Sequence, residues 1–364
     1  METISDSLNI EFEALNTENH LRAKPPKQSY LYFPSEYEMV EFDNKNPKKI
    51  LRRIFEGGVK FNDFEEENFI NFSKFLEEKS IILPNYWEKF NTIRFLQANG
   101  YDFEKTLKFI MEHIEWRLKY LPVVPTDNVK RILNLGYLYI HGRDNRFRPI
   151  LVLNPDIFVQ NLNKYCLDDW INALIYMLEY IKEHCFLPGQ IENWNLICDV
   201  GKSSIVFMPK ELKTLMSILQ SNYRCRLYVM YIVNVSLFVK VLWKTINILL
   251  DPSTQRKIKL LQGEAEIERE IFKNINRKQI EKRFGGLAEN IEGRFFPPVF
   301  PSDEYFTSAE DEKVLIDEDM YAEISKSNPM LKKSPFINQQ EQYLRGDMIT
   351  LENRQNVVNK ADSI

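Results

Sequence analysis

The sequence predicts an α/β fold in which helices pack on a mixed or parallel β-sheet, preceded by an all-helical segment. Short runs of β-branched and aromatic residues alternate with amphipathic stretches over residues 123–300. Apolar residues recur at spacings of three and four over residues 46–122. Residues 1–45 and 301–364 are polar and lack such periodicity. We therefore expect a flexible leader at 1–45 and a polar tail at 301–364 that is either disordered or packed on the domain.

Residues 46–122 are expected to form a helical subdomain. The apolar spacing predicts helices over residues 48–55, 64–81 and 86–98. The clearest helix follows Asp102, a good N-cap residue, and keeps its apolar residues on one face. Pro122 is expected to end it, because proline cannot continue a helix.

Residues 123–300 are expected to supply the sheet and its covering helices. Strands are predicted at 137–140, 150–153, 195–198, 228–233 and 258–261. Helices are predicted at 167–185, 209–219 and 236–250, followed by two short helices that end at Gly285-Gly286. Alternation of strand and helix favours parallel neighbours in the sheet.

Charge and composition argue against several classes of protein. The chain has 48 basic and 52 acidic residues, a net charge of -4, so we expect no nucleic-acid partner. Its four cysteines form no CxxC pair and it has four histidines, so we expect no metal site. The first residues are acidic, which predicts no signal peptide and a cytoplasmic protein with free thiols. Polar residues interrupt the longest apolar stretch, so we expect no membrane span. We also expect the protein to be a monomer.

No group of residues has the pattern of a catalytic site. Gly201-Lys202-Ser203 follows a strand as a phosphate-binding loop would, but that loop needs glycine where Leu196 stands. Cys198 and Cys225 lie at or near strands with no histidine placed to activate them, so we interpret them as core thiols. We therefore expect a protein that is not an enzyme and has no cofactor.

The predicted helix at 236–250 is apolar around nearly its whole circumference. Such a helix is either deeply buried or faces lipid, and both interpretations fit the pattern. Five basic residues against one acidic residue over 240–259 give a local charge of +4, which favours contact with an anionic membrane surface. Trp243 suits the membrane interface. The apolar positions that we assign to the contact surface are Leu237, Phe238, Val241, Leu242, Ile246 and Leu249.

The order of short motifs from about residue 95 to residue 298 resembles that of the CRAL-TRIO lipid-transfer family, which includes phosphatidylinositol/phosphatidylcholine transfer proteins. The first half of the resemblance comprises Arg94-Phe95-Leu96, Gly100-Tyr101-Asp102, Trp116-Arg117 and Arg148-Pro149. The second half comprises Tyr231-Ile232-Val233-Asn234, Leu250-Asp251-Pro252 followed by Thr254, Lys257 and Ile258, and Lys282-Arg283-Phe284-Gly285-Gly286.

The resemblance implies a CRAL-TRIO cup with a sheet as its floor, a gate helix at 236–250 and a helical N-terminal subdomain. It also implies that Thr254 and Lys257 contact the phosphate of an inositol lipid, for which a hydroxyl and an ammonium are suitable ligands. The alternative is that Lys257 is only a solvated side chain at the end of a strand and binds no ligand. Two further positions differ from the family. Asn99-Gly100 stand where the family has a basic pair, and Cys225 stands where it has an acidic residue that supports this subsite.

The resemblance further places four cavity-lining positions, which cradle choline in the family, on residues without hydroxyls: Ile140, Leu151, Trp194 and Leu196. The function that it implies is phosphatidylinositol binding, with transfer or presentation between membranes of the Golgi or ER type. The bound phospholipid is then the ligand, and the membrane surface is a peripheral, reversible partner. Two alternatives stay open: a carrier of another small hydrophobe (a sterol, isoprenoid or tocopherol-like molecule), and a lipid-sensing scaffold.

Overall fold

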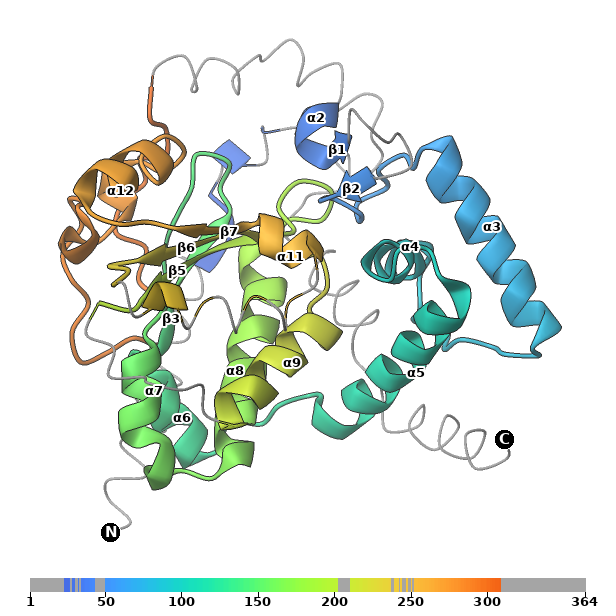
Figure 1. Ribbon diagram of the computed structural model, residues 1–364, viewed down its shortest axis with the longest axis horizontal. Helices are drawn as coiled ribbons and strands as arrows, with labels where there is room; N and C mark the ends of the chain where they lie inside the picture. Colours follow the sequence, from blue (N-terminus) through green and yellow to red (C-terminus); the bar gives the residue numbers. More distant parts are fainter. Residues whose placement is uncertain are drawn as a thin grey trace. The chain divides into compact units, whose positions relative to one another are not determined.

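The computed structural model describes residues 23–26, 28–29, 32, 34–42, 50–201, 210–236, 239–241, 243, 247, 250 and 252–308. These residues belong to two compact units (Figure 1). One unit comprises residues 36–123, and the other comprises residues 124–308 together with the described residues before 36.

The first unit is mainly helical. It contains α2 (Glu36–Met39), β1 (Val40–Phe42), β2 (Ile50–Arg52), α3 (Asp63–Glu78), α4 (Lys89–Ala98) and α5 (Phe103–Tyr120). The Asn62 side chain caps α3 and pairs with Glu65 in a capping box, and the predicted N-cap Asp102 accepts from the Lys105 amide at the start of α5. Residues from α3, α4 and α5 bury one apolar core: Phe72, Leu76, Phe95, Leu96, Leu107, Ile110 and Ile114.

The predicted helix at 48–55 is wrong, because β2 occupies this segment and pairs antiparallel with β1. Tertiary contacts decide the conformation of these few residues. The Gln97 side-chain amide bonds both main-chain groups of Arg52, at 2.6 and 3.0 Å. The Arg52 guanidinium forms a buried two-point ion pair with Glu65. The leader also differs from the prediction in its last part, since α2 and β1 lie within residues 36–42.

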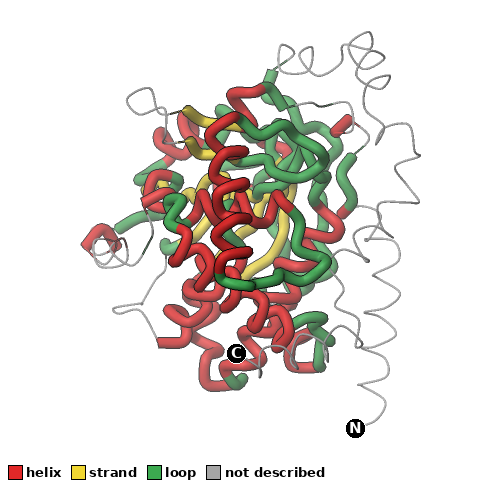
Figure 2. The backbone as a smooth tube through the Cα atoms, turned by 90° about the vertical axis from the view of Figure 1, so that its right-hand side faces the viewer, coloured by secondary structure: helices red, strands yellow, loops and turns green. Residues whose placement is uncertain are grey.

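The second unit contains the five strands that the sequence predicts. They are β3 (Leu138–Arg143), β4 (Pro149–Leu153), β5 (Trp194–Asp199), β6 (Leu227–Val233) and β7 (Ile258–Leu260). The strands lie in sequential order, β3-β4-β5-β6-β7. The β3–β4 pair is antiparallel and the other pairs are parallel, so the sheet is mixed, as predicted. Figure 2 shows the strands of this sheet in yellow.

The helical elements of this unit precede, connect and follow the strands. They are α6 (Asp127–Leu133), α7 (Pro155–Asn161), η2 (Leu162–Lys164), α8 (Leu167–Tyr180), the π-helix η3 (Ile181–Cys185), α9 (Lys210–Asn222), α11 (Pro252–Arg256), α12 (Glu264–Glu270), η4 (Arg277–Gln279) and η5 (Lys282–Phe284). The prediction missed the seven-residue helices α6 and α7, although Thr126 and Asn154 cap them. Gly285 is the left-handed C-cap that the sequence predicts.

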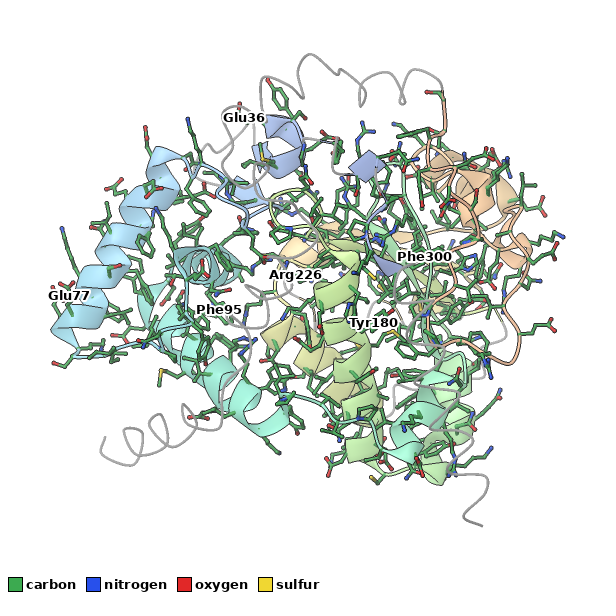
Figure 3. All side chains as sticks on the ribbon, turned by 180° about the vertical axis from the view of Figure 1, so that it is seen from behind. Glu36, Glu77, Phe95, Tyr180, Arg226 and Phe300 are labelled. Atoms are coloured by element: carbon green, nitrogen blue, oxygen red, sulfur yellow. The ribbon has the colours of Figure 1, made fainter. Side chains whose placement is uncertain are left out.

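One face of the sheet is closely packed from β3 to β6, and we call it the back face. Tyr139, Val152, Ile197 and Tyr231 cross it in register. Residues from α12 to η5, together with Phe295, bury this row: Ile267, Ile271, Ile275, Ile280, Phe284 and Phe295. The segment after η5 also returns to α8, where the Phe296 ring lies 5.0 Å from that of Tyr180, which is labelled in Figure 3.

Candidate functional site: an apolar sheet face beneath a helical segment

The face opposite the back face is apolar from edge to edge. Residues paired in register on neighbouring strands share a face, so the pairing defines rows across the sheet. The first row is Ile140, Leu151, Leu196, Met230 and Ile258. The second row is Leu138, Leu153, Cys198, Ile232 and Leu260. We call these two rows the apolar floor.

The floor side chains are buried at the β3 edge of the sheet and only half-buried toward β7. Ile140 and Leu151 are 0% and 2% exposed. The half-buried members are Leu153, Leu196, Met230, Ile258 and Leu260. Removing apolar surface from water contributes about 25 cal/mol per Å². An acyl chain or another apolar ligand over these side chains would therefore be stabilised.

The strand order explains why helices gather over this floor. Connections between parallel strands are right-handed in nearly all proteins, so sequential strands place their connecting helices on one face. Figure 1 shows α8 and α9 together on one side of the strands. Val239 and Trp243, from the predicted gate, pack against Cys198 and Ile232 of the floor.

The gate prediction covers residues that the structure describes only in part. Residues 239–241, 243 and 247 are helical, and the Ser236 hydroxyl caps the start by accepting from the Val239 amide at 3.2 Å. Val241 is 65% exposed, whereas Val239 and Trp243 face the floor, so this segment has apolar residues on two sides. The other predicted gate residues, Leu237, Phe238, Leu242, Ile246 and Leu249, lie outside the described residues.

The structure brings three of the four predicted cavity-lining residues together. Ile140, Leu151 and Leu196 are successive members of the first floor row. Trp194 lies two residues before Leu196 on β5 and outside the two floor rows, and its partner on β6 is Leu227. Its ring instead stacks on Phe186, with centroids 5.9 Å apart.

Thr254 lies in α11, and Lys257 lies between α11 and β7. The Thr254 carbonyl accepts from the Lys257 amide at 3.0 Å. Lys257 is only 8% exposed, and its ammonium donates to the Leu227 carbonyl at 2.8 Å. The ammonium thus links the start of β7 to the start of β6. An ammonium carries three N–H donors, so this contact is compatible with a further anionic ligand.

Sequence reasoning missed Gln255, which lies between these two residues. Its side-chain amide donates to the carbonyls of Asn247 at 2.7 Å and Leu250 at 3.0 Å. The last carbonyls of a helix lack partners within the helix, and Gln255 supplies donors at the end of the predicted gate. The signal in the sequence is an amide side chain a few residues beyond a helix that ends at Asp251-Pro252.

Not all of the basic residues around the predicted gate are free to contact an anionic surface. Lys240 and Arg256 are exposed, but Lys257 is buried and Lys259 pairs with Glu270 at 2.8 Å. Hydrogen bonds from Lys259 and Arg269 lower the pKa of the Glu270 carboxyl. Within the described residues of this region, the charge available to an anionic surface therefore rests mainly on Lys240 and Arg256.

The buried thiols of this unit are protonated at neutral pH. Burial raises the pKa of Cys198 to about 12 and that of Cys185 to about 11. Both are therefore poor nucleophiles, which agrees with the interpretation of Cys198 as a core thiol. Among the residues that the structure describes, no cluster of three or more His, Cys, Asp or Glu is placed to hold a metal ion. No helix in the same described part is long and apolar enough to cross a membrane.

Comparison with known proteins gives a family match and several similar proteins. The CRAL/TRIO domain family matches residues 133–286. Phosphatidylinositol/phosphatidylcholine transfer protein SFH4 of Arabidopsis thaliana is 25% identical over 255 residues, covering 62% of this chain and 40% of that protein. Phosphatidylinositol/phosphatidylcholine transfer protein SFH9 of Arabidopsis thaliana is 26% identical over 229 residues, covering 55% of this chain and 38% of that protein.

The chain thus spans about two fifths of the length of these curated relatives. Among solved structures, the crystal structure of Sfh5 matches with a TM-score of 0.49 at 15% identity, covering 73% of this chain and 100% of that one. The matched residues 133–286 contain all five strands of the second unit. The part of the chain that carries the five-stranded sheet is therefore similar to the CRAL/TRIO domain.

Proposed function

We propose that this chain binds a phospholipid on the apolar floor and transfers or presents it between membranes, without catalysing a reaction on it. The observation that carries the proposal is the half-buried part of the floor beneath Val239 and Trp243. Hiding acyl chains is worth about 0.8 kcal/mol per CH₂, so a lipid leaves a bilayer readily only for an equally dry site. The names of the relatives SFH4 and SFH9 support a phospholipid as the ligand.

Phosphatidylinositol is the proposed ligand, with its phosphate at Thr254 and Lys257. These residues lie at the amino end of β7, next to the floor residue Ile258. Exposed Val241, Lys240 and Arg256 provide apolar and basic contacts for a reversible encounter with a membrane. We propose that this encounter takes place at the cytosolic face of internal membranes.

The test is liposome-to-liposome transfer of labelled phosphatidylinositol and phosphatidylcholine, measured in parallel. Lys257→Met keeps the apolar stem and removes the ammonium. We expect it to lower phosphatidylinositol transfer about 10- to 100-fold, because a hydrogen bond to a charged group is worth about 1.5–3 kcal/mol. Lys259→Met is the matched control, since Lys259 pairs with Glu270. Thermal unfolding verifies that both variants fold.

Unchanged phosphatidylinositol transfer by folded Lys257→Met would remove the head-group assignment and leave the floor as the binding surface. Transfer of neither lipid by the wild-type chain would contradict the proposal as a whole.

A second candidate function is carriage of a small hydrophobe such as a sterol or isoprenoid. The observation that favours it is that both floor rows consist of Ile, Leu, Met and Cys, with no hydroxyl or charged side chain. Mass spectrometry of the lipid that co-purifies with the chain separates the two functions. A phospholipid supports the first, and a single hydrophobe without phosphate supports the second.

A further inference from the structure

One buried carboxyl group lies beside the floor, at the end where strand β4 finishes. Asp156 follows the floor residue Leu153 by three positions, in the first turn of α7, and is 7% exposed. Burial, Asp199 and Asp156 together raise the pKa of the Cys198 thiol to about 12, so the Asp156 carboxyl group lies near this member of the second floor row. The floor is apolar in both rows and therefore has a polar group at this end.

The Asp156 carboxyl group has no hydrogen bond that offsets its burial. Its Oδ1 atom is buried and has no hydrogen-bond partner among the residues that the structure describes. Leaving such an atom unpaired costs free energy, and the cost is greater for a charged group than for a neutral one. Buried polar groups in folded proteins are nearly always paired, so this oxygen calls for a partner from outside the chain.

Neighbouring polar groups do not present the same case. The Asp199 carboxylate is paired, since its Oδ1 atom accepts from the Asn234 side chain at 2.9 Å and from the Gly201 amide at 3.0 Å. The Tyr137 hydroxyl and the Trp170 indole nitrogen are also buried without partners in the described part of the chain. Both belong to rings that pack edge to face, with centroids 5.0 Å apart, and the apolar ring surface offsets their burial. A carboxyl group has no such surface.

Asp156 and Lys257 lie at opposite corners of the floor. Strands β4 to β7 run parallel, so the first floor row lies toward their amino ends and the second toward their carboxyl ends. Lys257 precedes Ile258 of the first row on β7, whereas Asp156 follows the second row on β4. Strands β4 and β7 are three strand spacings apart, or about 14 Å. One small head group cannot contact both residues, so Asp156 suits a polar group on a different part of a ligand, or on a different ligand.

We propose that Asp156 binds the hydroxyl group of an apolar ligand that lies on the floor. A hydroxyl group donates and accepts, so it pairs with a carboxyl group in either protonation state. The ligand class is a hydrophobe with a hydroxyl group and no phosphate, such as a long-chain, isoprenoid or sterol alcohol. This inference rests on the second candidate function, carriage of a small hydrophobe, and names the group by which that ligand is recognised.

The experiment compares two ligands that differ only in a hydroxyl group, 1-hexadecanol and hexadecane. The full chain is incubated with phosphatidylcholine vesicles that contain both compounds and phosphatidylinositol, and mass spectrometry quantifies what the protein takes up. We expect Asp156→Leu to lower the ratio of alcohol to alkane about 10-fold relative to the wild-type chain, because the alcohol loses a hydrogen bond and the alkane loses nothing. Asp156→Asn keeps an acceptor and should keep part of the preference.

The variants are chosen so that folding does not obscure the result. Replacing an unpaired buried polar group by an apolar one of similar size is close to neutral or stabilising, so Asp156→Leu should fold, and thermal unfolding checks it. Asp199→Asn is the matched control, since it removes the other charge near Cys198 and keeps the acceptor for Asn234 and Gly201. Tyr137→Phe removes a different buried hydroxyl. Both controls should leave the ratio unchanged.

The outcomes separate this inference from phosphatidylinositol transfer. Equal ratios in the wild-type chain and folded Asp156→Leu would overturn it, since water would then be the partner of the carboxyl group. An equal fall of the ratio in Tyr137→Phe would also overturn it, because the effect would not belong to Asp156. Uptake of phosphatidylinositol but of neither hexadecanol nor hexadecane by the wild-type chain would leave only the transfer function standing. Uptake of the alcohol without phosphatidylinositol would leave only the inference, and uptake of no lipid would remove both.

Discussion

The two faces of the five-stranded sheet are built from alternate residues of the same strands, yet they are covered in different ways. On the back face, Tyr139, Val152, Ile197 and Tyr231 are each 2% exposed or less. Two of them carry hydroxyls, and that of Tyr139 donates to Glu281 at 2.6 Å. On the floor, half of the members remain half-buried and the cover is a helical segment held by a few polar ties. The back face is a packed core, whereas the floor leaves apolar surface partly uncovered, which the proposed ligand would occupy.

Neighbouring residues of β5 test this division most strongly. Ile197 is fully buried on the back face, and Leu196 is half-buried on the floor. We expect Ile197→Ala to lower the free energy of unfolding by about 2–5 kcal/mol, because it leaves a cavity in a packed core. We expect Leu196→Ala to lower it by about 1 kcal/mol, since less apolar area is lost. Urea unfolding of both variants measures the difference.

The functional readout should show the reverse order. Leu196→Ala should weaken lipid retention, while Ile197→Ala should retain lipid at temperatures where it stays folded. Equal losses of stability in the two variants would show that the floor is packed as tightly as the back face, and would remove the distinction.

Protonation of buried His141 should make the free energy of unfolding depend on pH, which tests how tightly the back face is packed. His141 lies two residues from Tyr139 on β3, is 2% exposed, and burial lowers its pKa from 6.5 to about 4. Glu281 acts in the opposite direction and Arg283 in the same direction as burial. The unfolded chain therefore binds a proton near pH 6.5, and the folded chain resists it until about pH 4. Stability is complete above pH 6.5 and falls as the pH drops toward 4, by up to about 3 kcal/mol.

His141→Gln removes the titrating group and should flatten this part of the pH profile. The measurement is the free energy of unfolding of the wild-type chain and the variant at several pH values between 7 and 4. Parallel profiles for the two proteins would show that His141 does not carry the acid sensitivity.

The strands of the second unit could be predicted from the sequence, whereas the faces of the sheet could not. The runs in β4 and β6 are apolar at almost every position, because a parallel sheet covered on both sides buries alternate residues equally. Only the register shows that Leu196 joins Met230 and Ile258 on the floor while Ile197 joins Tyr231 on the back. The resemblance located Ile140, Leu151 and Leu196 on one surface, and the strand pairing places these three residues in one row.

Short elements and side-chain caps escaped prediction for a different reason. β2 is a strand because Gln97, distant in sequence, bonds its main chain, and no local pattern reports that contact. The role of Gln255 likewise depends on carbonyls that lie five and eight residues before it. Periodicity reports burial, whereas such polar contacts are visible only once the chain has been placed in space.

The smallest expected effect on stability comes from adding a hydroxyl to the floor. Leu196→Thr changes a half-buried side chain and should alter the free energy of unfolding by about 1 kcal/mol or less. Its neighbours in the row are Leu151 and Met230, so the new hydroxyl would be a polar group on an otherwise apolar surface. A ligand with a polar group at that depth gains a hydrogen bond, and a purely apolar ligand gains nothing.

We therefore expect Leu196→Thr to raise the ratio of phosphatidylcholine to phosphatidylinositol recovered from mixed vesicles by a few-fold. Ile258→Thr, at the β7 end of the same row, is the control, because it introduces the same hydroxyl at a different place on the floor. A change of ratio in Leu196→Thr alone would place the lipid's polar group near β5. The same change in both variants would mean that the floor responds to polarity in general, and that its two ends do not differ in what they contact.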